Sequence, residues 1–253
     1  MTSNIAIESR DFSHFFGPLQ TLKKINLQVF RNEILGIIGP AGSGKSTFLR
    51  SLNRLNDLVP GSRVEGTLKI DGKDIYAPDM SVVELRRKLG IVFATPVPLP
   101  RSIYENVAFG PKMAGVHSRR KLNELVADCL KQTTLWEEVK DRLDSSALKL
   151  SGGQQQRLCV ARILALRPDY ILLDEPCSGL DPISTMKIEE SLRELKKQYT
   201  IILVTNNTKQ AARVADRTAF FLSGEMIEIG QTEKIFTAPV DQRTNDYIVG
   251  RFG

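Results

Sequence analysis

In the N-terminal part of the chain, hydrophobic and polar positions follow the two-residue period of β-strands. Residues 24–29 alternate between polar and apolar side chains, which predicts a strand with one buried face. The apolar run 34–38 is typical of a strand that is covered on both faces. Residues 64–76 predict a hairpin that turns at Asp71 and Gly72, because this pair tolerates positive φ. This part of the chain is therefore expected to be rich in strands.

Helical patterns dominate the middle of the chain, from residue 102 to residue 166. A strand is predicted at 90–94, and the loop that follows contains three prolines, Pro96, Pro98 and Pro100. Prolines at this density exclude a regular helix or a central strand. Ser102 and Glu105 then have the spacing of a capping box, and residues 119–131 are amphipathic. The middle of the chain is therefore predicted to be a helical segment.

Strands and helices alternate again after this segment. Apolar strands are predicted at 170–173 and 200–204, with a long helix from Pro182 to about Gln198 between them. Residues 218–229 predict a hairpin. Strands separated by helices favour a parallel sheet, so the fold class is α/β. We expect a mixed sheet core with an antiparallel N-terminal β part and an inserted helical subdomain.

Composition narrows the class of protein only slightly. The 253 residues are 42% hydrophobic and 25% charged, which excludes collagen-like, disordered and disulfide-rich chains. The three cysteines are widely spaced and predict reduced thiols in a cytosolic protein. Neither a membrane-spanning run nor a signal peptide is predicted. The net charge of +6 is too small to indicate nucleic-acid binding, and no nucleic-acid partner is expected.

A glycine-rich turn between the strand at 34–38 and the next helix carries the strongest chemical signal. It fits the pattern G-x-x-x-x-G-K-[ST] with Gly39, Pro40, Ala41, Gly42, Ser43, Gly44, Lys45 and Ser46, and Thr47 follows in the helix. This helix is predicted from apolar positions that fall on one face, which are Phe48, Leu49, Leu52 and Leu55. Backbone N–H groups in such a loop can surround phosphate oxygens, while Lys45 bridges the β- and γ-phosphates and Ser46 ligates Mg²⁺. The alternative is a glycine-rich turn with one exposed lysine. The complete pattern favours a nucleotide site.

Two carboxylates, Asp174 and Glu175, directly follow the apolar strand that starts at Tyr170. In a protein with this phosphate-binding loop, Asp174 would hold Mg²⁺ through water. Glu175 would orient or deprotonate the water that attacks the nucleotide. The alternative is a strand that ends in solvated acids. Beside an intact P-loop, the pair predicts a site that hydrolyses nucleotides.

The octet 150–157 distinguishes between classes of P-loop protein. It reads Leu-Ser-Gly-Gly-Gln-Gln-Gln-Arg, and Ser151 and Gln154 alone fit the simpler interpretation of a capped helix start. The complete octet resembles the signature motif of ATP-binding-cassette (ABC) ATPases. The order of motifs is also similar to that family, because the P-loop, the signature, the acidic strand and the segment 178–181 follow one another.

The resemblance covers essentially the whole chain and implies a P-loop NTPase fold of the ABC type. It implies one ABC ATPase domain over residues 1–253, with residues 1–94 and 167–253 as the α/β core and residues 95–166 as the helical signature subdomain. It also implies ATP and Mg²⁺ as cofactors and ATP hydrolysis as the activity.

ABC ATPases form head-to-tail dimers, in which the signature of one subunit closes over ATP on the P-loop of the other. The resemblance therefore implies ATP contacts from Ser151, Gly152, Gly153 and Gln154. It implies that Phe16 stacks on adenine, with ordinary core packing as the alternative. Asp181 would lie at the subunit interface, or would only cap the helix that begins at Pro182.

Three stretches, 52–57, 71–78 and 246–253, resemble the ATPase subunits of phosphate importers. This implies import of inorganic phosphate with membrane-spanning permease subunits, and a peripheral place on the cytoplasmic face of the inner membrane. The proline loop and the middle helices would face the permease. The second ATPase would be an identical copy or a paralogue. The competing hypotheses are an ATP-dependent dimerisation switch, an ABC protein that acts on nucleic acid or a protein assembly, and a small-molecule kinase.

Two positions depart from the family pattern. The family has a glutamine at the end of the strand before the proline loop, where this chain has Ala94. A methyl group neither coordinates a hard cation nor accepts a hydrogen bond from water. The family has a histidine after the strand at 200–204, where this chain has Asn206, which is shorter and cannot become cationic. Together these differences predict ATP binding with slow hydrolysis, in which Asn206 is a weak substitute for the histidine; the alternative is ordinary turnover.

Overall fold

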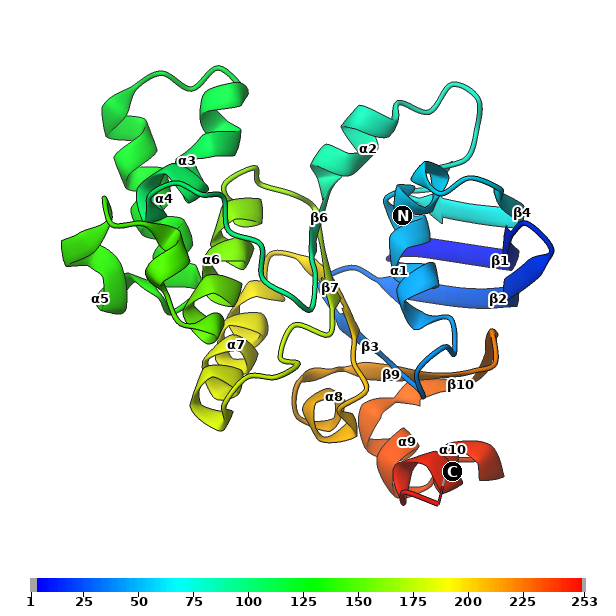
Figure 1. The fold of residues 1–253 in the computed structure, drawn as a ribbon. Coiled ribbons are helices and arrows are strands. Elements are labelled where there is room, and N and C mark those ends of the chain that lie inside the picture. The colour runs from blue at the N-terminus through cyan, green and yellow to red at the C-terminus, as the bar shows by residue number, and fades with distance from the viewer. Residues whose placement is uncertain (1–3, 252–253) are drawn as a thin grey trace.

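An antiparallel sheet and a mixed sheet form the framework of the protein (Figure 1). The structure is a computed structural model that describes residues 4–251. The antiparallel sheet has the order β2-β1-β4-β5 and contains β1 (Ile5–Phe16), β2 (Leu19–Phe30), β4 (Ser62–Ile70) and β5 (Lys73–Asp74). The predicted hairpin turn is confirmed, because Asp71 and Gly72 both have positive φ, 52° and 76°.

The second sheet has six strands in the order β10-β9-β3-β8-β7-β6. They are β3 (Ile34–Ile38), β6 (Leu89–Val92), β7 (Tyr170–Asp174), β8 (Thr200–Val204), β9 (Arg217–Leu222) and β10 (Glu225–Gln231). All neighbours are parallel except β9 and β10, so the sheet is mixed, as predicted. Every residue of β3, β7 and β8 is buried, which explains why these strands are apolar throughout.

Ten α-helices lie in the described part of the chain. They are α1 (Lys45–Leu52), α2 (Val82–Lys88), α3 (Ile103–Met113), α4 (Arg119–Gln132), α5 (Trp136–Val139), α6 (Gly152–Leu164), α7 (Pro182–Leu195), α8 (Thr208–Val214), α9 (Thr232–Thr237) and α10 (Gln242–Ile248). Short 3₁₀ turns cover Leu55–Leu58, Lys140–Arg142 and Ala147–Lys149. None of these helices is both long and apolar enough to cross a membrane.

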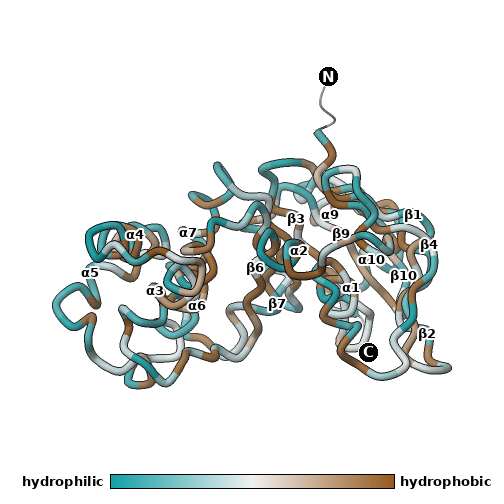
Figure 2. Tube along the Cα trace, turned by 90° about the horizontal axis from the view of Figure 1, so that it is seen from above, coloured by the Kyte–Doolittle hydropathy of each residue, from teal (hydrophilic) through white to brown (hydrophobic). Residues whose placement is uncertain are grey.

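Alternate residues of the central strands belong to two separate hydrophobic clusters. Leu172 and Ile202 pack with α1 and the antiparallel sheet, so α1 lies between the two sheets. Their neighbours Ile171 and Ile201 face the other way and pack with residues of α3, α4, α6 and α7. Seen from above, the helical lobe (α3, α4, α5 and α6) and the antiparallel sheet lie at opposite ends of the molecule (Figure 2).

Several element ends differ from the sequence prediction for local reasons. The helix predicted to include Leu55 ends at Leu52, because Asn53 caps it and Arg54 has a left-handed φ of 57°. The strand predicted at 90–94 is β6, which ends at Val92 before the proline loop. The long helix predicted to reach Gln198 ends at Leu195. The assignment of the whole chain to one domain with a helical insertion stays a prediction.

Tyr170 connects the two sheets, and replacing it with phenylalanine should weaken the fold. It is fully buried on β7, and its hydroxyl donates to Asp71 Oδ1 at 2.6 Å. We expect Tyr170→Phe to lower the free energy of unfolding by about 1–2 kcal/mol in urea titrations, since the part-buried Asp71 carboxylate keeps Arg31 but loses the Tyr170 hydroxyl as a donor. Tyr199→Phe is the control, because no hydrogen bond of its hydroxyl occurs among the described residues. Equal losses in both variants would contradict the connection.

Candidate functional site

The loop from Gly39 to Gly44 has a backbone that only glycine accommodates at several positions. Gly39, Gly42 and Gly44 have φ values of 149°, 75° and 99°. A Cβ atom on Gly39 would lie 2.1 Å from the carbonyl oxygen of Phe221, so the loop packs tightly against β9. Gly44 precedes α1 and provides no side-chain cap, so the first N–H groups of α1 remain available to an anion.

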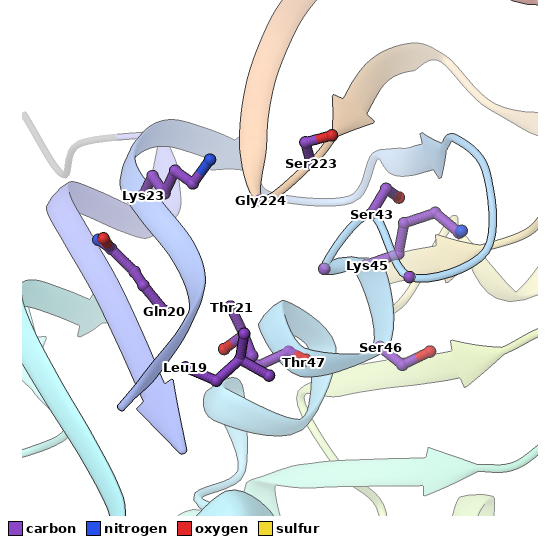
Figure 3. A pocket seen from close by; sticks show the side chains of 12 residues that line it. Leu19, Gln20, Thr21, Lys23, Ser43, Lys45, Ser46, Thr47, Ser223 and Gly224 are labelled. Atoms are coloured by element: carbon purple, nitrogen blue, oxygen red, sulfur yellow. The ribbon is translucent and has the colours of Figure 1, made fainter. Parts of the chain in front are cut away.

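The loop lines a cavity of about 450 Å³. Its walls come from β2, from the loop and first turn of α1, and from the turn between β9 and β10 (Figure 3). The lining residues are Leu19, Gln20, Thr21, Lys23, Gly42, Ser43, Gly44, Lys45, Ser46, Thr47, Ser223 and Gly224. The structure thus brings Thr47 and most of the predicted loop residues to one cavity.

The β2 side of the cavity and the Ser223 turn were not predicted from the sequence. Lys23 adds a cation to the wall, yet nothing in its local sequence distinguishes it from other surface lysines. Phe16 is not part of the lining. Its half-buried ring packs against His14, with ring centroids 4.5 Å apart. Stacking of Phe16 on adenine stays a prediction.

Lys45 is held inside the phosphate-binding loop by the loop itself. Its Nζ donates to the carbonyl oxygens of Gly39 and Pro40, both at 2.8 Å. Burial lowers the pKa of Lys45, while the negative charges of Glu175 and Asp174 oppose that shift. The ammonium group is therefore fixed at the centre of the loop and faces the two carboxylates at the end of β7.

Ser46 and Asp174 are in direct contact although they lie far apart in the sequence. Ser46 Oγ donates to Asp174 Oδ1 at 2.7 Å. Arg50 Nη2 donates to the other carboxylate oxygen, Oδ2, at 3.2 Å, and its guanidinium also lies 5.8 Å from the ring centroid of Phe93. The hydroxyl and carboxylate predicted to hold Mg²⁺ therefore lie side by side. Arg50 is a further residue of this site that the motifs did not indicate.

Glu175 follows Asp174 in a strained backbone position. Its φ is 51°, and its N–H donates to the carbonyl oxygen of Val204 at 2.8 Å. Burial raises the pKa of the Glu175 carboxyl, Lys45 opposes this, and Asp174 adds to it. A carboxyl with a raised pKa beside a lysine is suited to accept a proton near neutral pH.

The two departures from the family pattern flank Glu175. Val92 on β6 pairs with Leu173, and Val204 on β8 pairs with Asp174, so Ala94 and Asn206 follow the two strands on either side of β7. Asn206 is exposed, and its side chain has no hydrogen-bond partner among residues 4–251. Neither Ala94 nor Asn206 therefore supplies a polar group that is held in place beside Glu175.

The signature octet forms the start of α6, as the capping-box pattern indicates. Ser151 Oγ accepts from the Gln154 N–H at 3.3 Å, and Gln154 Oε1 accepts from the Ser151 N–H at 3.0 Å. Ser151 and Gly152 are exposed, whereas Gly153 is buried against Ser184 of α7. None of the signature residues lines the P-loop cavity of the same chain.

Asp181 is the N-cap of α7, with its Oδ1 accepting from the Ser184 N–H at 2.9 Å. The capping interpretation of Asp181 is therefore correct for the isolated chain. Its carboxylate is exposed, so a place at a subunit interface stays a prediction.

The residues of this site fit ATP and Mg²⁺ chemically. Ser46 and Asp174 are oxygen donors of the type that Mg²⁺ prefers. Ser43 Oγ is buried and has no hydrogen-bond partner within the described part of the chain, which leaves a polar group for a phosphate oxygen. Lys45 and the start of α1 supply positive charge in the same loop.

Comparison with known proteins places the chain in a family. Residues 22–178 match the family model described as ABC transporter. CbiO1 from Clostridium perfringens, described as part of the ABC transporter complex CbiONQ, superposes with a TM-score of 0.82 at 27% identity, covering 98% of this chain and 97% of that one. A bacterial Atm1-family ABC exporter with ATP bound has the same fold, with a TM-score of 0.82 at 24% identity, and this chain spans 43% of its length.

The family match covers more than half of the chain and includes the P-loop, the signature helix and the acidic strand. ABC ATPase domains bind ATP with Mg²⁺ and hydrolyse ATP. The chain belongs to the ABC transporter family as an ATP-binding domain.

Proposed function

We propose that the chain is the ATP-binding subunit of an ABC importer that couples ATP binding and hydrolysis to the import of inorganic phosphate. The observation that carries the ATPase part is the convergence of Lys45, the Ser46–Asp174 pair and Glu175 at one edge of the sheet. Two oxygen donors for Mg²⁺, one cation and one carboxyl with a raised pKa suit the hydrolysis of a nucleoside triphosphate.

Each of these residues has a separate task in this mechanism. The loop N–H groups and Lys45 bind and orient the phosphates. Ser46 and Asp174 would hold Mg²⁺, which would neutralise charge on the phosphate oxygens. Glu175 orients the attacking water and accepts its proton, and its raised pKa brings it closer to the pH at which it acts.

A second ATPase subunit would complete the site. Ser151 and Gly152 are exposed at the start of the 13-residue helix α6, whose N–H groups and hydroxyl suit an anion. Since they do not reach the P-loop cavity of their own chain, they are available to the nucleotide on another copy or a paralogue. This supports a head-to-tail dimer, as the resemblance implies.

Membrane-spanning permease subunits are the proposed partners, at the cytoplasmic face of the inner membrane. A mostly apolar groove of about 440 Å³ lies where β6 meets the proline loop, and it is lined by Ile91, Val92, Phe93, Thr95, Val97, Leu99, Phe109, Cys159 and Arg162. This is the face predicted to contact the permease. CbiO1 is itself part of a transporter complex, which supports a similar arrangement here.

The identity of the solute depends on resemblance alone. The stretches 52–57, 71–78 and 246–253 resemble the phosphate-importer subfamily, although Phe252 and Gly253 lie outside the described residues. We infer inorganic phosphate as the imported anion from these stretches.

A second candidate is an ATP-dependent dimerisation switch with little hydrolysis. It is favoured by Ala94 and Asn206, which lie on both sides of Glu175 and leave the attacking water with fewer polar contacts. Nucleotide binding by Lys45 and Ser46 would be unaffected. Steady-state ATPase activity, measured with ATP binding on the same sample, separates the two candidates.

Glu175→Gln should abolish most turnover and stabilise the nucleotide-free protein. Loss of a general base lowers kcat by about 10²–10⁴-fold, with little change in ATP affinity. Burial raises the pKa of Glu175, so its protonated form stabilises the folded state at low pH, and this stabilisation is lost as pH rises through that pKa. The neutral glutamine avoids this loss and should therefore raise Tm at pH 7. The exposed Glu190→Gln is the control. Undiminished turnover would exclude Glu175 as the base.

Restoring both family residues should increase turnover. Contacts of this kind contribute roughly 10²–10³ in rate each, so we expect Ala94→Gln with Asn206→His to raise kcat at least about tenfold at unchanged ATP affinity. Thr95→Gln is the control for adding an amide nearby. If kcat of the double variant equals that of the original chain, the two positions do not limit hydrolysis.

Uptake measurements test the solute. Cells that lack this chain should lose high-affinity uptake of radiolabelled phosphate, and the original chain should restore it. Lys45→Ala should fail to restore uptake, since the P-loop cation that binds the phosphates of ATP is missing. Normal phosphate uptake with a defect for another solute would contradict phosphate import while leaving the ATPase intact.

A further inference from the structure

Glu138 on the short helix α5 is the centre of a charged network that contacts the signature turn, residues 151–154. Its carboxylate accepts from Arg157 Nη1 at 2.9 Å and Nη2 at 3.1 Å, from Lys187 Nζ at 2.6 Å, and from Gln154 Nε2 at 2.8 Å. These four residues come from α5, α6 and α7. We call them the Glu138 network.

The Glu138 network contains a buried cation, the guanidinium of Arg157, which depends on Glu138 for its counter-charge. The Arg157 side chain is only 3% exposed, and its Nη1 also donates to the Thr134 carbonyl at 2.7 Å. Burial opposes ionisation of Glu138, but hydrogen bonds from Arg157, Lys187 and Gln154 outweigh it and lower the pKa of Glu138 to about 2. Removing the carboxylate would leave a buried guanidinium without its counter-charge, which is a costly state.

The network extends directly to the exposed end of the signature. Gln154 donates to Glu138 with its Nε2 and accepts from the Ser151 N–H with its Oε1. One amide side chain therefore connects the part-buried Glu138 carboxylate with the N-cap. Arg157 adds a second contact to the turn, since its Nε lies 3.4 Å from the Gly153 carbonyl oxygen.

Lys187 extends the same network to α7. This helix begins at Pro182, directly after Asp181. A Cβ atom on Gly153 would lie 2.2 Å from Ser184 Oγ, so α6 and α7 are in close contact near their N-termini. The signature turn and α7 are thus joined both by the packing of Gly153 against Ser184 and by the Glu138 network.

We propose that Glu138 is a positioning residue that holds the signature turn and the start of α7 in one fixed arrangement, ready for the nucleotide of a second copy of this chain. The inference rests on the proposed function, because it takes the signature as the surface that closes over ATP. Glu138 is not part of the P-loop cavity and does not contact Ser46 or Asp174. Its effect on the signature is exerted through Gln154 and Arg157.

A purely structural role of Glu138 would give a different experimental result. Removing one partner of a buried ion pair destabilises the fold, so a purely structural role would lower Tm without selecting one step of the ATP cycle. A positioning role instead weakens the ATP-dependent association of two copies and leaves ATP binding at the P-loop of a single chain intact. The two readouts separate these roles.

The test compares Glu138→Gln with Glu137→Gln, each combined with Glu175→Gln so that ATP is not consumed. Glu137 is the neighbouring residue, but its side chain is 76% exposed and pairs only with Lys140 within the described chain. ATP-dependent dimerisation of the full chain is followed by light scattering across protein concentrations. ATP binding is measured at concentrations at which the chain is monomeric.

We expect Glu138→Gln to raise the dimer dissociation constant at saturating ATP by at least about tenfold, in line with the loss of one partner of a buried charge pair. Monomer ATP affinity should stay within about twofold, since the P-loop is not part of the network. Hydrogen–deuterium exchange should become faster at 151–157 and stay unchanged at 39–47. Glu137→Gln should match the parent in all three measurements.

Lys187→Met provides a second variant in case Glu138→Gln does not fold. It keeps the Arg157–Glu138 pair and removes only the connection to α7, so a smaller but measurable weakening of the dimer is expected. If the parent forms no dimer with ATP, the inference is overturned, because it takes a second copy of this chain as the partner, whereas the proposed function still allows a paralogue. If the parent dimerises and neither Glu138→Gln nor Lys187→Met weakens the dimer more than Glu137→Gln, only the positioning role is overturned.

Discussion

The parallel pairing of β3, β8, β7 and β6 is the constraint on which the site depends. Ile37 pairs with Val204, Val204 pairs with Asp174, and Leu173 pairs with Val92, so these strands end at one edge. The P-loop and the two carboxylates follow strand ends at that edge, as ligand sites do in open α/β sheets. A shift of one residue in this register would turn buried side chains to the other face and separate Ser46 from Asp174.

Residues that act within a contiguous motif could be predicted from the sequence. The P-loop pattern specified both Lys45 and Ser46, and the apolar strand before Asp174 indicated where the carboxylates would lie. The strands β3 and β8 have the predicted ends because every one of their residues is buried. The helix α1 was predicted to continue to Leu55 but ends at Leu52, because helical periodicity does not indicate the left-handed turn at Arg54.

Contacts between distant side chains could not be predicted in the same way. Arg50 contacts Asp174 across 124 positions of sequence, and Lys187 contacts Glu138 across 49. Neither pair has a periodic signal, because surface charges recur at similar spacing throughout soluble proteins. Glu138 lies on a helix of four residues, which is too short to be recognised by its pattern. Such contacts are specified only once the helices have packed.

The position of Lys45 has a consequence for how the loop meets its ligand. Its ammonium already has two oxygen partners, the carbonyl groups of Gly39 and Pro40. When phosphate binds, its oxygens therefore replace the carbonyl oxygens around the Lys45 ammonium, which is already in place. The Lys45 side chain does not have to close over the anion. Such a loop is preorganised at a low entropic cost, and it discriminates against weakly charged anions that cannot compete with its own carbonyl groups.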